Sequence, residues 1–351
     1  MSKSRHFFST GDSRIINLKF SSGVMNLTIS LNRFGDFPFR QSLMLIRPFH
    51  IVHQLAIVLL VVSLKGYFPP WYIFLKAWLM LFLLMPFLFG LNDLMHRLED
   101  RRMGRDRLFT SESISMISVG FFLGSVFLVM ALIALESGLM TFVWLLLMIL
   151  CGLLYGYFKH ERRTFLTYIF RMLSGVTFYL VVSMYFGFSS IDGWVSLVVG
   201  VLDLFSHVAG DLRDFPMDVA GGVRTFPVVY GVDRTERFIF GLQLLGLFLV
   251  GIIFRYGFWF WLFILVGCSL GWLTYFVLRE GNAYSWQHAA FHGQKILIYV
   301  LVGVFHGVSI WFVPLYMMGW FVSYCLYLWA DDRLSGSSGL LGYVLSNPLC
   351  L

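Results

Sequence analysis

The sequence has few charged residues and few cysteines. Charged side chains make up 13% of the 351 residues and hydrophobic ones 58%. That charged share is about half that of a soluble domain and leaves too little polar surface to coat a globule in water. The four cysteines form no CxxC pair and show no histidine spacing typical of zinc, so we expect them to be small apolar core residues. The main solvent of this chain is therefore expected to be lipid.

The sequence also predicts no cleavable signal peptide. Basic residues interrupt the first forty positions, and no apolar core precedes a small-residue site. Residues 1–44 are therefore expected to form a cytosolic N-terminal segment. Its alternating stretch, 15–29, fits either a short segment on the membrane surface or an unstructured tail.

Long apolar runs are what the sequence has in abundance. Backbone groups inside lipid must be paired within the protein, and these runs are continuous where barrel strands would alternate. The sequence thus predicts an all-α fold, a polytopic membrane helical bundle of nine core transmembrane helices over a domain at 45–313. A C-terminal helix and tail at 314–351 would add either a tenth span or an interfacial helix at 316–330. The predicted spans are 45–64, 71–95, 114–136, 138–158, 164–187, 192–211, 236–255, 258–278 and 294–313.

Lysine and arginine predict the orientation of the bundle. They gather in alternate loops, after the second, fourth, sixth and eighth spans, as short cytosolic loops do. We therefore expect an integral, multi-pass membrane protein whose N-terminus and active-site loops are cytosolic. Topology beside anionic lipid accounts for the net charge of +7 without a nucleic-acid partner.

Acidic residues cluster at the ends of two predicted spans. After the second span, Asp93, His96 and Asp100 would lie within roughly a 60° arc of one helix face. At the end of the sixth, a longer stripe would span roughly 80° if the helix persisted. Pro216 makes that doubtful and predicts Asp218 on the following loop. The stripe comprises Asp203, His207, Asp211, Asp214 and Asp218.

Clustered carboxylates repel one another unless cations lie between them. Hard oxygen ligands of this kind suit Mg²⁺, which one or two carboxylates and substrate phosphates typically hold. The sequence thus implies a diphosphate at the membrane surface, with nearby polar and basic residues available to bind it. Alternatively, the acids pair with neighbouring arginines in solvated loops. The candidate diphosphate-binding residues are Asn92, His96, Arg101, Lys159, Arg162 and Arg224.

The two clusters resemble the paired acidic motifs of the UbiA prenyltransferase superfamily. The stronger match is the second, where Asp211-x-x-Asp214-x-x-x-Asp218 precedes Gly222 and Thr225-x-Pro-Val. The resemblance implies an intramembrane enzyme that uses Mg²⁺ to ionise an allylic isoprenyl diphosphate. It implies catalytic roles for Asp93, Asp100, Asp214 and Asp218, and metal-binding roles for these four and Asp211. Where the family has an aspartate, this chain has His96, which predicts a weakened metal site.

Three functions fit this resemblance and these residues. A prenyltransferase would pass the isoprenyl cation to an acceptor that the sequence does not identify. A membrane terpene cyclase would capture it within the same chain, and a transporter or non-enzymatic protein would only bind ions. Asp203, His207 and Gln54 are candidates for acceptor binding or for a base, although Asp203 and His207 equally fit a buried hydrogen-bonded pair. The stretch 286–292 is expected as an interfacial segment or a third cytosolic contact.

Overall fold

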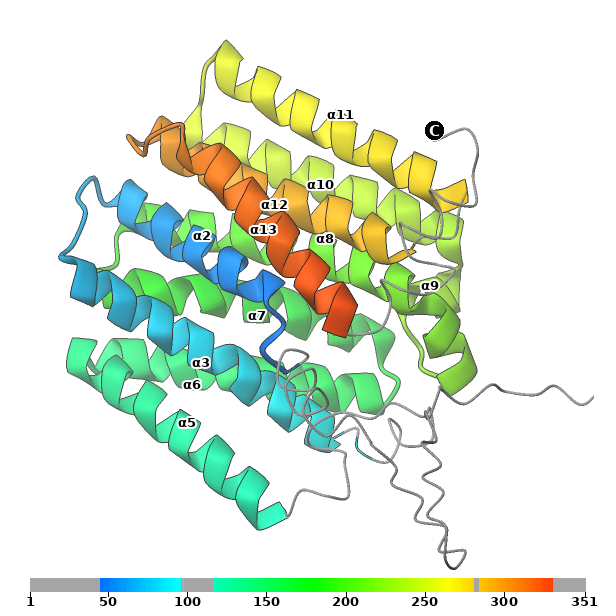
Figure 1. Ribbon diagram of the computed structural model, residues 1–351, viewed down its shortest axis with the longest axis horizontal. Coiled ribbons are helices and arrows are strands. Elements are labelled where there is room, and N and C mark those ends of the chain that lie inside the picture. The colour runs from blue at the N-terminus through cyan, green and yellow to red at the C-terminus, as the bar shows by residue number, and fades with distance from the viewer. Residues whose placement is uncertain (1–44, 96, 98–115, 281–283, 331–351) are drawn as a thin grey trace, which may run out of the picture.

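The computed structural model of the protein describes residues 45–95, 97, 116–280 and 284–330, and the elements in these ranges are helices (Figure 1). Predictions for residues 1–44, His96, Asp100 and Arg101 lie outside the described residues. The helices are α2 (Phe49–Leu64), α3 (Trp71–Met95), α5 (Met116–Ser137), α6 (Leu139–His160), α7 (Thr164–Tyr185), α8 (Ser190–Gly221), α9 (Phe226–Tyr230), α10 (Val232–Phe254), α11 (Phe258–Glu280), α12 (Tyr284–Phe305) and α13 (Phe312–Ala330).

Length and apolarity make most of these helices membrane spans. Among the described residues, eight helices are long and apolar enough to cross a bilayer, and α2 and α13 are shorter apolar helices. The predicted all-α membrane bundle is confirmed, and the chain is an integral, multi-pass membrane protein. The count of nine core spans stays a prediction.

Helices α8 and α12 form the centre of the bundle. The apolar window of α8 is 89% buried and that of α12 is 78% buried, against 28% for α5 and 22% for α11. Figure 1 accordingly shows α5 and α11 at opposite edges. Because α8 packs against α7, α9, α10 and α12, its polar side chains face protein and not lipid.

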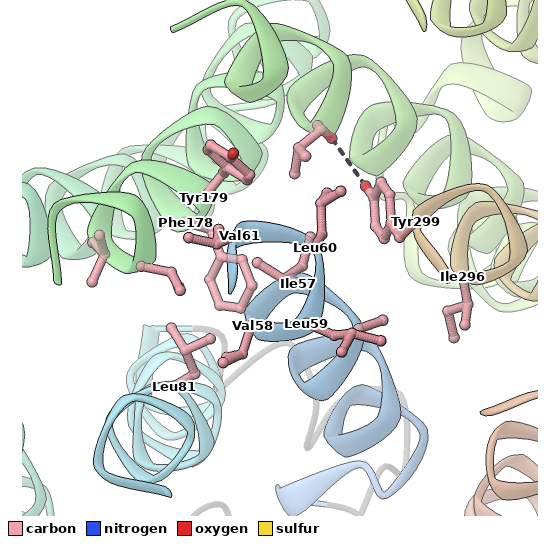
Figure 2. Close-up of a cluster of buried hydrophobic side chains, with 14 of the residues drawn as sticks. Ile57, Val58, Leu59, Leu60, Val61, Leu81, Phe178, Tyr179, Ile296 and Tyr299 are labelled. Atoms are coloured by element: carbon pink, nitrogen blue, oxygen red, sulfur yellow. Dashed lines mark hydrogen bonds between the residues drawn. The ribbon is translucent and has the colours of Figure 1, made fainter. Parts of the chain in front are cut away.

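A dense apolar core surrounds α2. Ile57, Val58 and Val61 are fully buried and lie among side chains of α3, α7 and α12 (Figure 2). The hydroxyl of Tyr299 donates to the carbonyl of Val199, 3.5 Å away, which joins α12 to α8. Helix α2 is therefore fixed on several sides, although it is short for a span.

The prediction that Asp218 lies on a loop is wrong. Helix α8 continues through Pro216 to Gly221 and is capped by Gly222, whose φ of 66° suits glycine. The amide of Val223 then donates to the carbonyl of Asp218 at 2.9 Å. The packing of α8 outweighs the backbone hydrogen bond that proline removes.

The predicted span 294–313 also needs correction, because α12 runs from Tyr284 to Phe305 and the chain turns at Gly307, where φ is 96°. The stretch 286–292 is thus the beginning of a transmembrane helix. Lys295, which the charge pattern counts with Arg279 among the basic residues of the loop after the eighth span, is fully buried inside α12. A buried partner for its ammonium, described below, explains why this charge does not mark the end of a span.

Candidate functional site

The polar stripe of α8 forms one wall of an internal cavity of about 180 Å³. Its five side chains line this cavity, together with residues of α2, α3, α6, α7 and α12. Asp203, Asp211 and Asp218 are 3–4% exposed, so they are not solvated loop acids. The five are Asp203, His207, Asp211, Asp214 and Asp218.

Asp211 is oriented by two neighbouring helices. The hydroxyl of Tyr168 on α7 donates to Asp211 Oδ2 at 2.5 Å and accepts the backbone N–H of Phe226 at 2.7 Å. The other oxygen, Oδ1, lies 3.9 Å from Nε2 of His207. His207 in turn shares a 3.1 Å hydrogen bond with the Tyr155 hydroxyl of α6. The carboxylate is thus held in place, with Oδ1 on the side of His207.

Asp214 is paired with its neighbour Arg213. Nε and Nη2 of the guanidinium donate to the two carboxylate oxygens at 2.9 and 2.8 Å. This is the arginine pairing that the sequence offered as an alternative for the acids. Both residues also line the cavity, so the pair does not take Asp214 away from it.

Two further predicted residues reach the cavity from α3 and α6, namely Asn92 and Lys159. Close helix packing brings them there: a Cβ added to Gly152 would lie 2.8 Å from Leu88 Cδ2, and one added to Gly156 would lie 2.3 Å from Met95 Cε. Small residues at these positions allow α6 to approach the end of α3. The cavity thereby receives an amide and an ammonium opposite the carboxylates of α8.

Other predicted residues lie elsewhere. Asp93 is buried, at 5% exposure, but does not line the cavity. Arg162 and Arg224 are exposed and also lie off it. Gln54 is buried and its Nε2 donates to the carbonyl of Leu81 at 2.9 Å, a link between α2 and α3. The functional roles given to these residues stay predictions.

Asp203 is bound on both sides by cations. Nη2 of Arg171 lies 2.7 Å from Oδ2, and Nζ of Lys295 lies 2.9 Å from Oδ1. Lys295 also donates to Ser206 Oγ at 2.9 Å. A carboxylate held this way has few free lone pairs for an acceptor, so its most evident contribution is to position α7 and α12 around the cavity.

His50 and His53 escaped the sequence reasoning, whereas His292 lies in the stretch 286–292 that it offered as a third cytosolic contact. His50 and His53 on α2 and Arg171 on α7 line the cavity, as does His292 on α12. The sequence contains a signal for such residues. A histidine pair three positions apart, or an arginine, is costly to bury in a membrane unless it has a partner or a ligand.

The donors in the cavity suit a hard cation and its phosphate ligand. The carboxylates of Asp211, Asp214 and Asp218 and the amide of Asn92 supply oxygen ligands, and Lys159 supplies a positive charge. Mg²⁺ prefers oxygen ligands and usually keeps places for substrate phosphates. These residues therefore fit Mg²⁺ bound to a diphosphate.

Solved structures share this fold. The UbiA homologue of Archaeoglobus fulgidus bound to GPP and Mg²⁺ is 15% identical, with a TM-score of 0.53 over 84% of this chain and 100% of that one. Its complex with DMAPP and Mg²⁺ has the same identity and TM-score, over 83% and 99%. A digeranylgeranylglyceryl phosphate synthase is also 15% identical, with a TM-score of 0.52 over 82% and 98%.

The sequence comparisons decide the family. No curated protein matches the chain. The family model described as the UbiA prenyltransferase family, however, matches residues 55–294, a stretch that contains both acidic clusters and all the helices from α3 to α11. This chain belongs to the UbiA prenyltransferase family.

Proposed function

We propose that this protein transfers an isoprenyl group from an allylic isoprenyl diphosphate to a small or lipophilic acceptor inside the membrane. One observation carries the proposal: a single cavity collects Asn92, Lys159 and the three aspartates at the end of α8. Homologues of the same fold bind GPP or DMAPP together with Mg²⁺, which is consistent with a diphosphate at these residues.

Mg²⁺ would be held by Asp211, Asp214 and Asp218, with Asn92 as a further oxygen donor. When bound, it would neutralise charge that develops on the leaving diphosphate. The ammonium of Lys159 would bind a diphosphate oxygen directly. Tyr168 would keep the Asp211 carboxylate from rotating, because its hydroxyl is itself fixed by the Phe226 amide.

The isoprenyl chain would extend from this polar end along the aromatic part of the cavity. Phe49, Phe89 and Phe178 line it, and aromatic faces can stabilise a carbocation while apolar walls exclude water. Helices α3 and α7, which carry Phe89 and Phe178, are membrane spans, a suitable environment for an apolar chain.

The polar lining favours transfer over cyclisation. A cyclase needs an inner cavity without nucleophiles, because any lone pair can capture its carbocation. Here His50, His53 and His292 lie in the same cavity as the aromatic side chains. Such groups are suited to binding a polar acceptor. The proposal also places the N-terminus and the entrance of the cavity on the cytosolic side of the membrane.

Diphosphate release by the purified full-length protein tests the proposal. Allylic diphosphates of several lengths would be supplied with Mg²⁺ or with EDTA, and with or without a lipid extract as the source of acceptor. We expect release that requires Mg²⁺ and rises when the extract is added. A cyclic hydrocarbon formed without the extract would instead identify a cyclase, and no release under any condition would overturn the enzyme proposal.

A further inference from the structure

Arg213 lies between Asp214 and the helices α12 and α13. Its guanidinium donates to both oxygens of the Asp214 carboxylate, and both residues line the cavity. The arginine side chain is 8% exposed and the aspartate side chain 26% exposed. Arg213 is thus a buried cation at the polar end of the cavity, beside a carboxylate that the proposed function assigns to Mg²⁺.

Side chains of α12 and α13 contact the other side of the guanidinium. Nη1 of Arg213 lies 3.5 Å from Nδ1 of His288 on α12, and Cζ lies 5.9 Å from the centre of the Tyr327 ring on α13. A guanidinium has no acceptor, so it donates to this nitrogen, and the ring face attracts its charge. The hydroxyl of Tyr324, also on α13, lies 2.8 Å from the same nitrogen and therefore donates to it as well. Tyr324 thereby fixes the imidazole that Arg213 contacts.

Helix α13 lies outside the stretch that the family model matches, which ends at residue 294. The helix packs against α2 and α12, and its residues Tyr324 and Tyr327 are 0% and 5% exposed. The contribution of α13 to the site is therefore a feature of this chain beyond the segment that defines the family.

Pairing with Arg213 disfavours a metal ion at Asp214. A metal ion needs a lone pair of the carboxylate, and both oxygens already accept from the guanidinium, whose positive charge also repels a divalent cation. A diphosphate would offer the same donors another anion, because a guanidinium binds phosphate and carboxylate with the same two-pronged geometry. Transfer of Arg213 from the carboxylate to a phosphate would then free Asp214 for the metal.

We propose that Arg213 couples metal binding at Asp214 to the binding of diphosphate. Without diphosphate the guanidinium pairs with Asp214; with diphosphate it pairs with a phosphate group, and Asp214 binds Mg²⁺. Tyr324 is a positioning residue for this exchange and acts through His288. The inference rests on the proposed function for the identity of the two ligands, but the binding of each can be measured without turnover.

The test measures each ligand alone with purified full-length protein in detergent. Mn²⁺ replaces Mg²⁺, and its free concentration is read from its electron paramagnetic resonance signal. Radiolabelled inorganic pyrophosphate is measured separately, by equilibrium dialysis in EDTA. Arg213→Gln should bind Mn²⁺ about tenfold more tightly and pyrophosphate about tenfold more weakly, within the range usual for coupled sites. A variant with a damaged cavity would bind both more weakly.

Asp214→Asn tests whether the arginine acts through this carboxylate. In that background Arg213→Gln should change the Mn²⁺ affinity by less than about twofold, because no carboxylate is left to release. A full gain of Mn²⁺ affinity in the double variant would show a general effect of charge and would overturn the proposal.

Tyr324→Phe tests the contribution of α13. The ring remains and the hydroxyl that contacts His288 is lost, so the Mn²⁺ affinity should rise by about threefold, less than in Arg213→Gln. Tyr316→Phe is the matched control. Tyr316 lies about two turns earlier on α13, where its ring lies 6.1 Å from that of Phe312, and the variant should leave both affinities unchanged.

Elution profile and thermal unfolding check that each variant folds. If Arg213→Gln does not, Arg213→Lys replaces it, since lysine keeps the charge and loses the two-pronged pairing.

Several results would overturn the proposal. They are weaker or unchanged Mn²⁺ binding in Arg213→Gln, unchanged pyrophosphate binding in that variant, and no pyrophosphate binding by the unmodified protein. Equal Mn²⁺ affinities of Tyr324→Phe and Tyr316→Phe would overturn the role of α13. The opposite effects of Arg213→Gln on the two ligands, without any diphosphate release from allylic substrates, would overturn only the proposed function.

Discussion

Lys295 and Asp203, ninety-two residues apart in the sequence, form an ion pair in the middle of the bundle. Lys295 Nζ lies 2.9 Å from Asp203 Oδ1, and the two side chains are 1% and 6% exposed. Arg171 binds the other carboxylate oxygen at 2.7 Å. One buried anion thus joins α7, α8 and α12 around the cavity.

The two partners should differ in their cost of removal. Asp203→Asn leaves two buried cations without their anion, whereas Lys295→Met leaves Asp203 paired with Arg171. We expect Asp203→Asn to lower the free energy of unfolding by about 3–5 kcal/mol and Lys295→Met to lower it less. Thermal unfolding in detergent measures both, and the double variant should lose less than the sum of the two. Additive losses would show that the pair is not coupled.

Asp218 lies at the end of the stripe, and the proposal assigns it to Mg²⁺. Asp218→Asn keeps its shape and removes the charge, so Mg²⁺-dependent diphosphate release should fall by about 10²–10³-fold. The control is Glu161→Gln, an exposed residue that follows α6, which should leave the rate within about twofold of the unmodified protein. An Asp218→Asn protein with full activity would remove Asp218 from the site.

Asp192 is a carboxylate at the opposite end of α8, roughly 39 Å from Asp218 at 1.5 Å per residue. It accepts hydrogen bonds from Lys65, from the Tyr179 hydroxyl at 2.8 Å and from the Ser189 amide at 2.7 Å. Asp192→Asn should therefore lower the midpoint of thermal unfolding while diphosphate release per folded molecule stays unchanged. A drop in that specific rate at full stability would contradict a purely structural role.

Gly200 sets the distance between α7 and α8. A Cβ at this position would lie 2.9 Å from the carbonyl oxygen of Met172 and 2.6 Å from Val176 Cγ2. Gly200→Ala should therefore destabilise the protein by about 1–3 kcal/mol. Gly241 on α10 has nothing within 4 Å of such a Cβ, and Gly241→Ala should be neutral or stabilising by up to about 1 kcal/mol. Thermal unfolding measures the effect of each substitution on stability. Equal effects of the two would contradict close packing at Gly200.

Local pattern was enough to predict the helical membrane fold and the polar stripe of α8. Apolar runs of span length leave a helix as the way to satisfy the backbone in lipid, and helical periodicity alone places Asp203, His207 and Asp211 on one face. The same reasoning failed at Pro216 and at Lys295, where packing against other helices outweighs the local signal.

Tertiary structure decided which residues lie opposite the polar stripe of α8. No spacing in the sequence brings Lys295 to Asp203, or His292 to His50 and His53, because those contacts join helices that are distant along the chain. Nor does a residue's type reveal its partner: Gln54 contacts a backbone carbonyl of α3, whereas His53 faces a cavity. The sequence determined which faces are polar, since periodicity is local, and the packing of the helices determined which polar groups share one cavity.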